Sequence, residues 1–186
     1  FKDAEYINYE LSLRFRFNDR LSIEWSGSGS NDNGNVGYAF RREANGDPIV
    51  GWRDVKQFTT LLSGLYNFTP RMFLTLRARH YWSSVRYEKY FNVDAKGYWI
   101  DRAFIAGNDN NYNAHNLDLF YTWDFMYGSR LIVGWKNWMP LDRTIEGLRF
   151  NKYGQNLLEV FRIPQGKELT ARLIYFLDYQ KLRRHR

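Results

Sequence analysis

The fold is decided by residues 5–27, which read EYINYELSLRFRFNDRLSIEWSG. From Tyr9 to Phe17 the odd positions are apolar and the even positions are polar or charged. A period of two is the spacing of a β-strand that has one apolar and one polar face. The apolar positions resume at Leu21, directly after a short polar turn. The stretch therefore predicts two antiparallel strands joined by a tight turn.

The rest of the chain repeats this unit of two alternating strands and a tight turn. Tight turns near residues 18, 70 and 127 alternate with three long polar connections. In bacterial outer-membrane barrels the short turns are periplasmic and the long loops are extracellular. We therefore expect an all-β fold, an antiparallel up-and-down transmembrane β-barrel to which this chain contributes about seven long strands. These strands are predicted at residues 5–17, 21–27, 52–68, 72–82, 116–125, 130–136 and 169–179.

The first hairpin and the connection after it give two local predictions. The three-residue turn sets Arg14 opposite Glu24, which is a favourable cross-strand pair of opposite charge. Residues 26–35 read SGSGSNDNGN and predict a flexible loop. Alternation returns at residues 36–40, which indicates either a restart of the preceding strand or a short extra strand.

The other two long connections also contain ordered-looking segments. Within residues 83–113, the parts at 85–91 and 98–105 can either extend the barrel wall or fold over its mouth. The third connection spans residues 139–167. Three apolar residues there have helical spacing and predict a helix of one or two turns. They are Leu157, Leu158 and Phe161.

Alternation sorts the strand residues into two sets, and in outer-membrane barrels the apolar set faces lipid while the polar set faces the interior. The residues expected to face lipid are Leu11, Leu13, Phe15, Leu74, Leu76, Leu119, Trp123, Leu131, Val133, Leu173 and Tyr175. The residues expected to face the lumen are Glu10, Arg14, Arg16, Glu24, Arg77, Arg79, Asp118, Asp124, Lys136 and Arg172. The polar set is open to two interpretations. One is a charged channel that selects solutes; the other, which we favour, is an ion-paired lining that stabilises the interior or contacts a plug or partner.

Composition agrees with a membrane barrel. Aromatic residues form 19% of the 186 residues, which is hard to bury in one small core and suits a membrane interface. No run of about 18 apolar residues occurs, so a transmembrane helix is excluded. The mean hydropathy of -0.60 does not exclude a barrel, because alternating faces average to a polar value. Much of the net charge of +7 lies in the basic tail at residues 181–186.

The sequence predicts no catalytic, cofactor-binding or metal-ligating residue, and we expect no enzyme activity. Asp118 and Asp124 lie along one strand about 20 Å apart, farther than the carboxyl pair of a glycosidase. The three histidines lack ligand spacing, and the chain has no cysteine. Residues 37–40 match the core of an RNA-recognition signature. Val36 and Arg41 break that signature and its packing helices are missing, so nucleic acid is not an expected partner.

Three segments resemble a known family. They read LRARHYWS at 76–83, YNAHNLDLFYTW at 112–123 and LIYFLDYQ at 173–180. The chain resembles the C-terminal barrel region of a large, poorly characterised family of Gram-negative outer-membrane proteins, over most of its length. The resemblance implies an upstream carbohydrate-binding-like β-sandwich of the family-nine type, and no catalytic residue or substrate. The basic tail departs from the terminal aromatic residue with which outer-membrane chains most often end.

The residues and the resemblance together predict that 1–180 form the C-terminal part of an outer-membrane β-barrel and 181–186 a tail, with upstream strands and the N-terminal domain outside this chain. We expect a non-enzymatic role in transport, secretion or surface glycan handling in the bacterial outer membrane, alone or in a larger complex. Expected partners are outer-membrane lipid, lipopolysaccharide and other outer-membrane or periplasmic proteins, with no cofactor. The alternative is a soluble β-barrel or β-sandwich that binds a ligand, with the apolar face inward.

Overall fold

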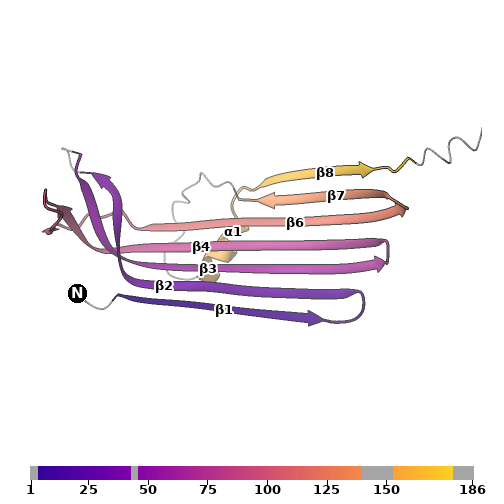
Figure 1. Ribbon diagram of the computed structural model, residues 1–186, viewed down its shortest axis with the longest axis horizontal. Coiled ribbons are helices and arrows are strands. Elements are labelled where there is room, and N and C mark those ends of the chain that lie inside the picture. The colour runs from indigo at the N-terminus through magenta and orange to yellow at the C-terminus, as the bar shows by residue number, and fades with distance from the viewer. Residues whose placement is uncertain (1–3, 43–45, 140–152, 178–186) are drawn as a thin grey trace, which may run out of the picture.

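The computed structural model describes residues 4–42, 46–139 and 153–177. They form one antiparallel sheet and a short helix (Figure 1). The long strands neighbour one another in the order β1-β2-β3-β4-β6-β7-β8, and the short β5 pairs with β4. The elements are β1 (Glu5–Arg16), β2 (Leu21–Arg42), β3 (Pro48–Thr69), β4 (Met72–Val93), β5 (Trp99–Arg102), β6 (Asn110–Met126), β7 (Ser129–Trp138), α1 (Tyr153–Val160) and β8 (Gly166–Ile174). The all-β, antiparallel prediction is confirmed; over the described residues the sheet stays open, with β1 and β8 at its edges.

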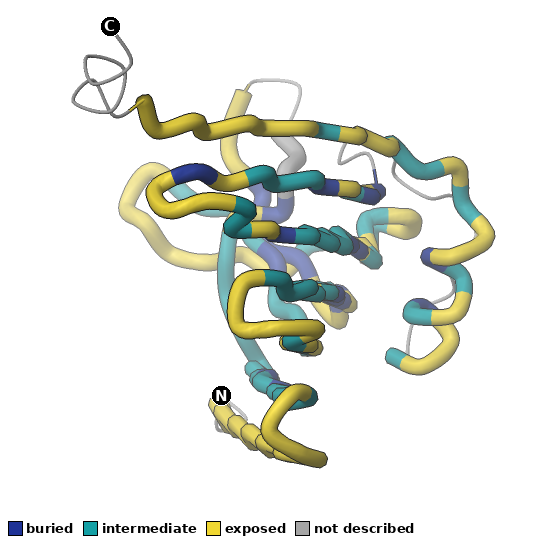
Figure 2. The backbone as a smooth tube through the Cα atoms, turned by 90° about the vertical axis from the view of Figure 1, so that its right-hand side faces the viewer, coloured by how far each residue is buried: buried dark blue, intermediate teal, exposed yellow. Residues whose placement is uncertain are grey.

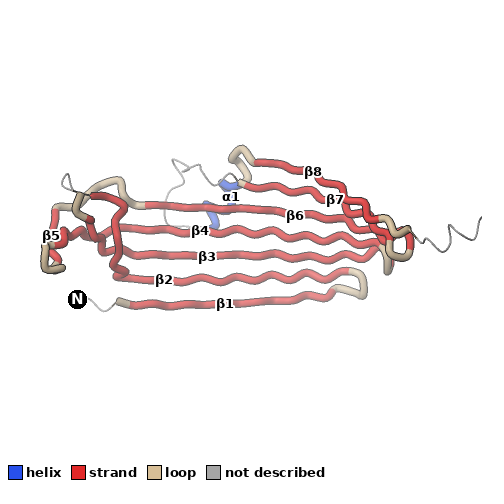
Figure 3. Tube along the Cα trace, turned by 45° about the horizontal axis from the view of Figure 1, so that its top comes forward, coloured by secondary structure: helices blue, strands red, loops and turns tan. Residues whose placement is uncertain are grey.

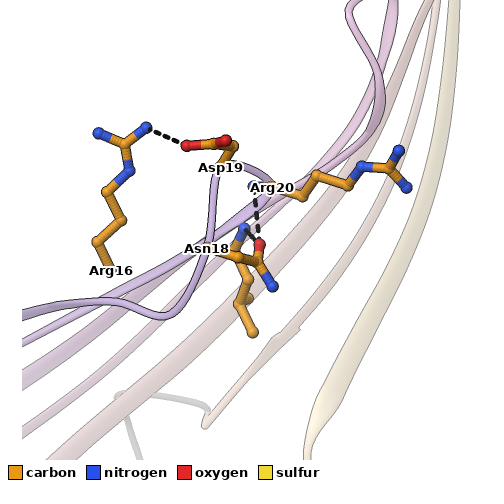
Figure 4. Close-up of polar contacts among 5 residues, drawn as sticks. Arg16, Asn18, Asp19 and Arg20 are labelled. Atoms are coloured by element: carbon orange, nitrogen blue, oxygen red, sulfur yellow. Dashed lines mark hydrogen bonds and ion pairs between the residues drawn. The ribbon is translucent and has the colours of Figure 1, made fainter.

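The three tight turns lie together at one end of the sheet, and β5 lies at the other end (Figure 3). At the first turn the side-chain oxygen of Asn18 accepts hydrogen bonds from the backbone N–H groups of Arg20 and Leu21, each at 2.8 Å (Figure 4). Arg16 also pairs with Asp19 at 3.0 Å. The Asn side chain closes the turn by replacing a backbone acceptor. Register then places Arg14 opposite Glu24, as predicted.

Replacing Asn18 by Ala is expected to lower the free energy of unfolding by about 1 kcal/mol, because two hydrogen bonds to the turn backbone are lost. Urea unfolding of the two proteins under the same conditions measures the difference. Asn18→Asp is the matched control, since its carboxylate can accept the same two bonds. If Asp destabilises the protein as much as Ala does, these bonds do not hold the turn.

The prediction of a flexible loop at residues 26–35 is wrong, because β2 runs without a break from Leu21 to Arg42. From Ser26 to Asp32 both of its edges are paired, to β1 and to β3, so these backbone groups are satisfied despite the polar sequence. The pairing with β3 then shifts register between Asp32 and Asn35 and continues to Arg42. Aromatic side chains occupy the space beside the glycines. A Cβ built on Gly29 would lie 2.7 Å from the ring of Phe58 and 2.7 Å from the hydroxyl of Tyr9. Glycine therefore permits close aromatic packing here and does not signal a loop.

The far ends of β2, β3 and β4 bend away from the line of the long strands (Figure 1) and contain the buried hydrophobic cluster. Its members are Ala39, Ile49, Tyr87 and Tyr90, with Val85 and Ile105 against them. Asn108 donates to the carbonyl of Ala39, and Asp109 accepts from the N–H of Tyr87. Within residues 83–113, β4 therefore extends the sheet to Val93, and the segment before β6 folds back against the ends of β2 and β4. That either part belongs to a barrel wall or covers a barrel mouth stays a prediction.

The last part of the chain matches its prediction in part. The helix predicted within residues 139–167 is confirmed as α1. The strand predicted at 169–179 begins earlier, at Gly166, and ends at Ile174. The end of that predicted strand and the basic tail lie outside the described residues. No helix in the described ranges has the length and apolarity needed to cross a membrane.

Candidate functional site

The strand register gathers the predicted apolar residues on one face of the sheet. For example, Phe15 lies beside Ile23, and Leu76 lies between Gly64 and Leu119. Tyr175 follows β8 directly, with its ring 6.4 Å from that of Phe125. The set placed on this face, which we call the apolar face, comprises Leu11, Leu13, Phe15, Leu74, Leu76, Leu119, Trp123, Leu131, Val133 and Leu173. That it meets lipid stays a prediction.

Much of the apolar face is exposed over the described residues. Leu11 is 54% exposed on β1 and Leu173 is 65% exposed on β8. On β4 and β6, between these edges, the apolar side chains are only partly covered by their neighbours within the sheet. A sheet-wide apolar surface of this kind marks contact with lipid, with protein or with another part of the same protein.

Aromatic rings border the apolar face near the tight turns. Trp123 contacts Phe125 with ring centroids 5.7 Å apart, and Tyr66 contacts Phe68 at 4.8 Å. Phe68 in turn lies 6.2 Å from Tyr121, which links β3 to β6. Together with Phe15, Phe17 and Tyr175, these rings form a row along the turn end, which we call the turn-side belt.

A second row of aromatic rings lies on the apolar face of β1, β3 and β4, farther from the turns. Tyr9 lies 6.1 Å from Phe58, and Phe58 meets the ring of Tyr153 edge-on at 4.7 Å. Trp82 lies 6.3 Å from Tyr153, which comes from α1. We call these four rings the loop-side belt. Between the belts the apolar face carries leucines together with Trp25 and Trp135.

The register also gathers the predicted polar residues on the opposite face. One row of hydrogen-bonded neighbours crosses all seven long strands and nearly alternates in charge. It consists of Arg14, Glu24, Ser63, Arg77, Asp118, Lys136 and Glu168. The remaining predicted members, Glu10, Arg16, Arg79, Asp124 and Arg172, lie on the same face by alternation. We call this the polar face; that it lines a lumen stays a prediction.

Ion pairs form along the polar face, but they do not include every cation. Arg14 pairs with Glu24 at 2.5 Å, and Lys136 with Glu168 at 3.5 Å. Near the third turn Asp124 pairs with Arg130 at 2.5 Å. These side chains are partly exposed, so each pair contributes little to stability. Among the described residues Arg77, Arg79 and Arg172 have no ion pair, and neither do the acidic Glu10 and Asp118 on the same face.

The helix α1 packs on the apolar face at the loop-side belt. Asn156 is 1% exposed, and its side-chain oxygen accepts from Asn111 at 2.8 Å and from Asn113 at 2.9 Å. The hydroxyls of Tyr153 and Thr60 lie 2.5 Å apart. Burial raises the pKa of the Tyr153 hydroxyl, and the bond with Thr60 partly opposes this shift. Hydrogen bonds of Tyr153 and Asn156 thus fix the helix to the sheet.

The fold places two histidines side by side beneath α1, although their spacing in the sequence does not predict this. His80 and His115 are direct neighbours across β4 and β6, and both are buried. The Nε2 atom of His80 lies 3.1 Å from the side-chain oxygen of Asn113. In the described part of the chain no group of three or more His, Cys, Asp or Glu residues could hold a metal ion. Their pairing depends on the length of the excursion between β4 and β6, which no local pattern predicts.

The polar face also contains a hollow of about 660 Å³ across β2, β3, β4 and β6. It lies next to the alternating row of charges, toward the loop end, because Arg79 comes two positions after Arg77 on β4. Its lining residues are Ser26, Ser28, Thr59, Leu61, Arg79, Tyr81, Tyr112, Ala114 and Asn116. Of these residues, the sequence predicted only Arg79 as a lumen-facing site residue.

Comparison with known proteins identifies a family without assigning an activity. No curated protein and no solved structure matches the chain. The model of a domain of unknown function, DUF5916, matches residues 1–186. The match covers both faces of the sheet, α1 and the hollow. The chain therefore belongs to the DUF5916 family.

Proposed function

We propose that this chain forms part of the wall of a transmembrane β-barrel in the bacterial outer membrane, with the apolar face toward lipid and the polar face toward an aqueous interior. One observation is the main support: an exposed apolar surface spans the sheet, with aromatic rings along its turn end and a second set of rings on β1, β3, β4 and α1 toward the loop end. Outer-membrane barrels have such a band, with aromatic girdles at both interfaces. The role is non-enzymatic, in transport, secretion or surface glycan handling.

The height of the apolar band fits a membrane. On β4 it runs from Met72 to Trp82. At about 3.4 Å per residue and a tilt of about 40°, this stretch spans roughly 26 Å, close to the apolar band of about 25 Å in outer-membrane barrels. At the loop end of this stretch His80 and Trp82 are buried against Tyr153, so there α1 presents the outer surface in place of the sheet.

The stagger of the strands fits a tilted barrel wall. Leu21 follows the first turn directly, and its neighbour Tyr66 lies several residues before the second turn. Tyr121, in the same row, lies farther still from the third turn. Rows of hydrogen-bonded neighbours therefore run obliquely to the line of turns. Strands that close into a barrel require such a stagger and tilt.

A wall of this kind needs strands beyond those described, since β1 and β8 each have one unpaired edge in the sheet. The family resemblance supports further barrel strands and a carbohydrate-binding-like domain in the same protein. Its expected surroundings are outer-membrane lipid, lipopolysaccharide and neighbouring outer-membrane or periplasmic proteins. The competing function is a soluble ligand-binding barrel whose interior is the apolar face.

Single cysteines test which face meets lipid, because the chain has none of its own. Leu13→Cys, Leu76→Cys and Leu173→Cys sample the apolar face, and the adjacent Arg14→Cys, Arg77→Cys and Arg172→Cys are their matched controls. Each is labelled with an environment-sensitive maleimide dye in proteoliposomes. We expect brominated lipid to quench the dye at the three leucine positions and aqueous iodide to quench it at the three arginine positions.

The opposite pattern, or a protein that stays dispersed in buffer without detergent or lipid, would overturn the proposal. A soluble barrel would bury the leucine positions and shield a dye there from both quenchers. Each leucine position is compared with the arginine next to it on the same strand. The two dyes therefore lie at nearly the same depth in the membrane, and depth does not explain a difference between them.

A further inference from the structure

We propose that the hollow on the polar face binds a neutral sugar ring of a saccharide chain. This rests on the proposed function, because the polar face must be open to water for a soluble saccharide to reach it. The inference deepens that function by naming the class of ligand that the wall contacts.

The floor of the hollow is made by short side chains on adjacent strands. Ser28 lies beside Thr59, and Thr59 lies beside Tyr81, which neighbours Ala114. In the next row Ser26 lies beside Leu61. Ser26, Ser28, Thr59 and Ala114 have short side chains, which leave space beside the longer Tyr81 and Arg79. The hollow has the volume of a small-molecule site.

Two tyrosines form an aromatic wall of the hollow. Tyr81 and Tyr112 lie with ring centroids 5.9 Å apart and ring planes inclined at 61°. Tyr112 is 37% exposed, so its ring is accessible from the hollow's open side. The C–H groups on one side of a pyranose are apolar and pack on an aromatic ring, whereas the hydroxyls at its edge need hydrogen-bond partners.

Those partners surround the two rings. Ser26, Ser28 and Thr59 supply hydroxyls that donate or accept. Asn116 supplies an amide that does both, and Arg79 supplies several N–H donors. A neutral polyol uses donors and acceptors together. An anion would use mainly the single arginine, and an apolar ligand would leave these groups without partners.

The test uses the full-length protein in detergent micelles, with maltohexaose, cellohexaose and chitohexaose as separate probes followed by isothermal titration calorimetry. We expect at least one probe to bind, and the double substitution Tyr81→Ala and Tyr112→Ala to weaken that binding by about tenfold or more. Tyr98→Ala is the matched control, because Tyr98 is exposed far from the hollow in the β4–β5 connection, and it should leave the affinity unchanged.

Three results would overturn the inference: no probe binds the native protein, the double variant binds as tightly as the native protein, or binding disappears in high salt as it would at an anion site. The cysteine measurements keep this inference separate from the proposed function. If brominated lipid quenches a dye at Leu76→Cys and iodide quenches it at Arg77→Cys but no saccharide binds, the membrane proposal stands and the saccharide site does not. If brominated lipid quenches the dye there, both are wrong.

Discussion

Replacing Leu76 by Arg is expected to lower the free energy of unfolding from lipid by about 2–4 kcal/mol, the cost of a cation near the midplane on the lipid face of a barrel. Leu76 lies between Gly64 and Leu119, near the middle of the apolar stretch of β4 from Met72 to Trp82, where no charged side chain is adjacent on the apolar face. Urea unfolding of the protein in lipid vesicles, followed by the change in heat-modifiable gel migration, measures the loss.

Leu65→Arg is the matched control, because it places the same side chain on the opposite face of the neighbouring strand. Leu65 lies between Ser22 and Thr75 on the polar face and is 36% exposed. An arginine there can extend into water, so we expect a change below about 1 kcal/mol. A larger loss at Leu65 than at Leu76 would mean that the polar face is the one excluded from water, and the orientation of the wall would be reversed.

The periodicity of the sequence predicts the faces well because it is a local property. A strand exposes alternate residues to opposite sides whatever its partners are, so odd and even positions sort correctly from Tyr9 to Phe15 and again from Met72 to Ala78. The first hairpin adds a short turn, which fixes register over few residues. Arg14 and Glu24 therefore pair as expected.

Sequence reasoning fails where long-range packing replaces local preference. The run at 26–35 is rich in turn-forming residues, yet two neighbouring strands and the rings of Trp25 and Phe58 hold it extended. The hollow and the pair of His80 with His115 both require the register between β4 and β6. That register is set only after the chain has passed through β5 and the fold-back segment.

Replacing Asn156 by Leu is expected to release α1 from the sheet. The carbonyl oxygen of this side chain accepts bonds from the amides of Asn111 and Asn113, and Leu offers neither of them an acceptor. Asn113 is buried and Asn111 is partly buried, and a buried donor left without its bond costs about 1–3 kcal/mol, so we expect docking of α1 to weaken by about 2–4 kcal/mol. Hydrogen exchange of the α1 amides, with limited proteolysis between β7 and β8, measures the opening.

Gln155→Leu is the control, because it replaces the adjacent amide of α1 by the same side chain at an exposed position. It should leave protection of the helix nearly unchanged. The comparison also separates the hydrogen bonds of Asn156 from the ring contacts of α1. The contacts of Tyr153 with Phe58 and Trp82 remain in both variants. If Asn156→Leu leaves α1 as protected as Gln155→Leu does, those rings dock the helix and the asparagine bonds add little. If exchange rises only in Asn156→Leu, the buried amide fixes the position of α1 on the apolar face, and the rings supply the surface against which it rests.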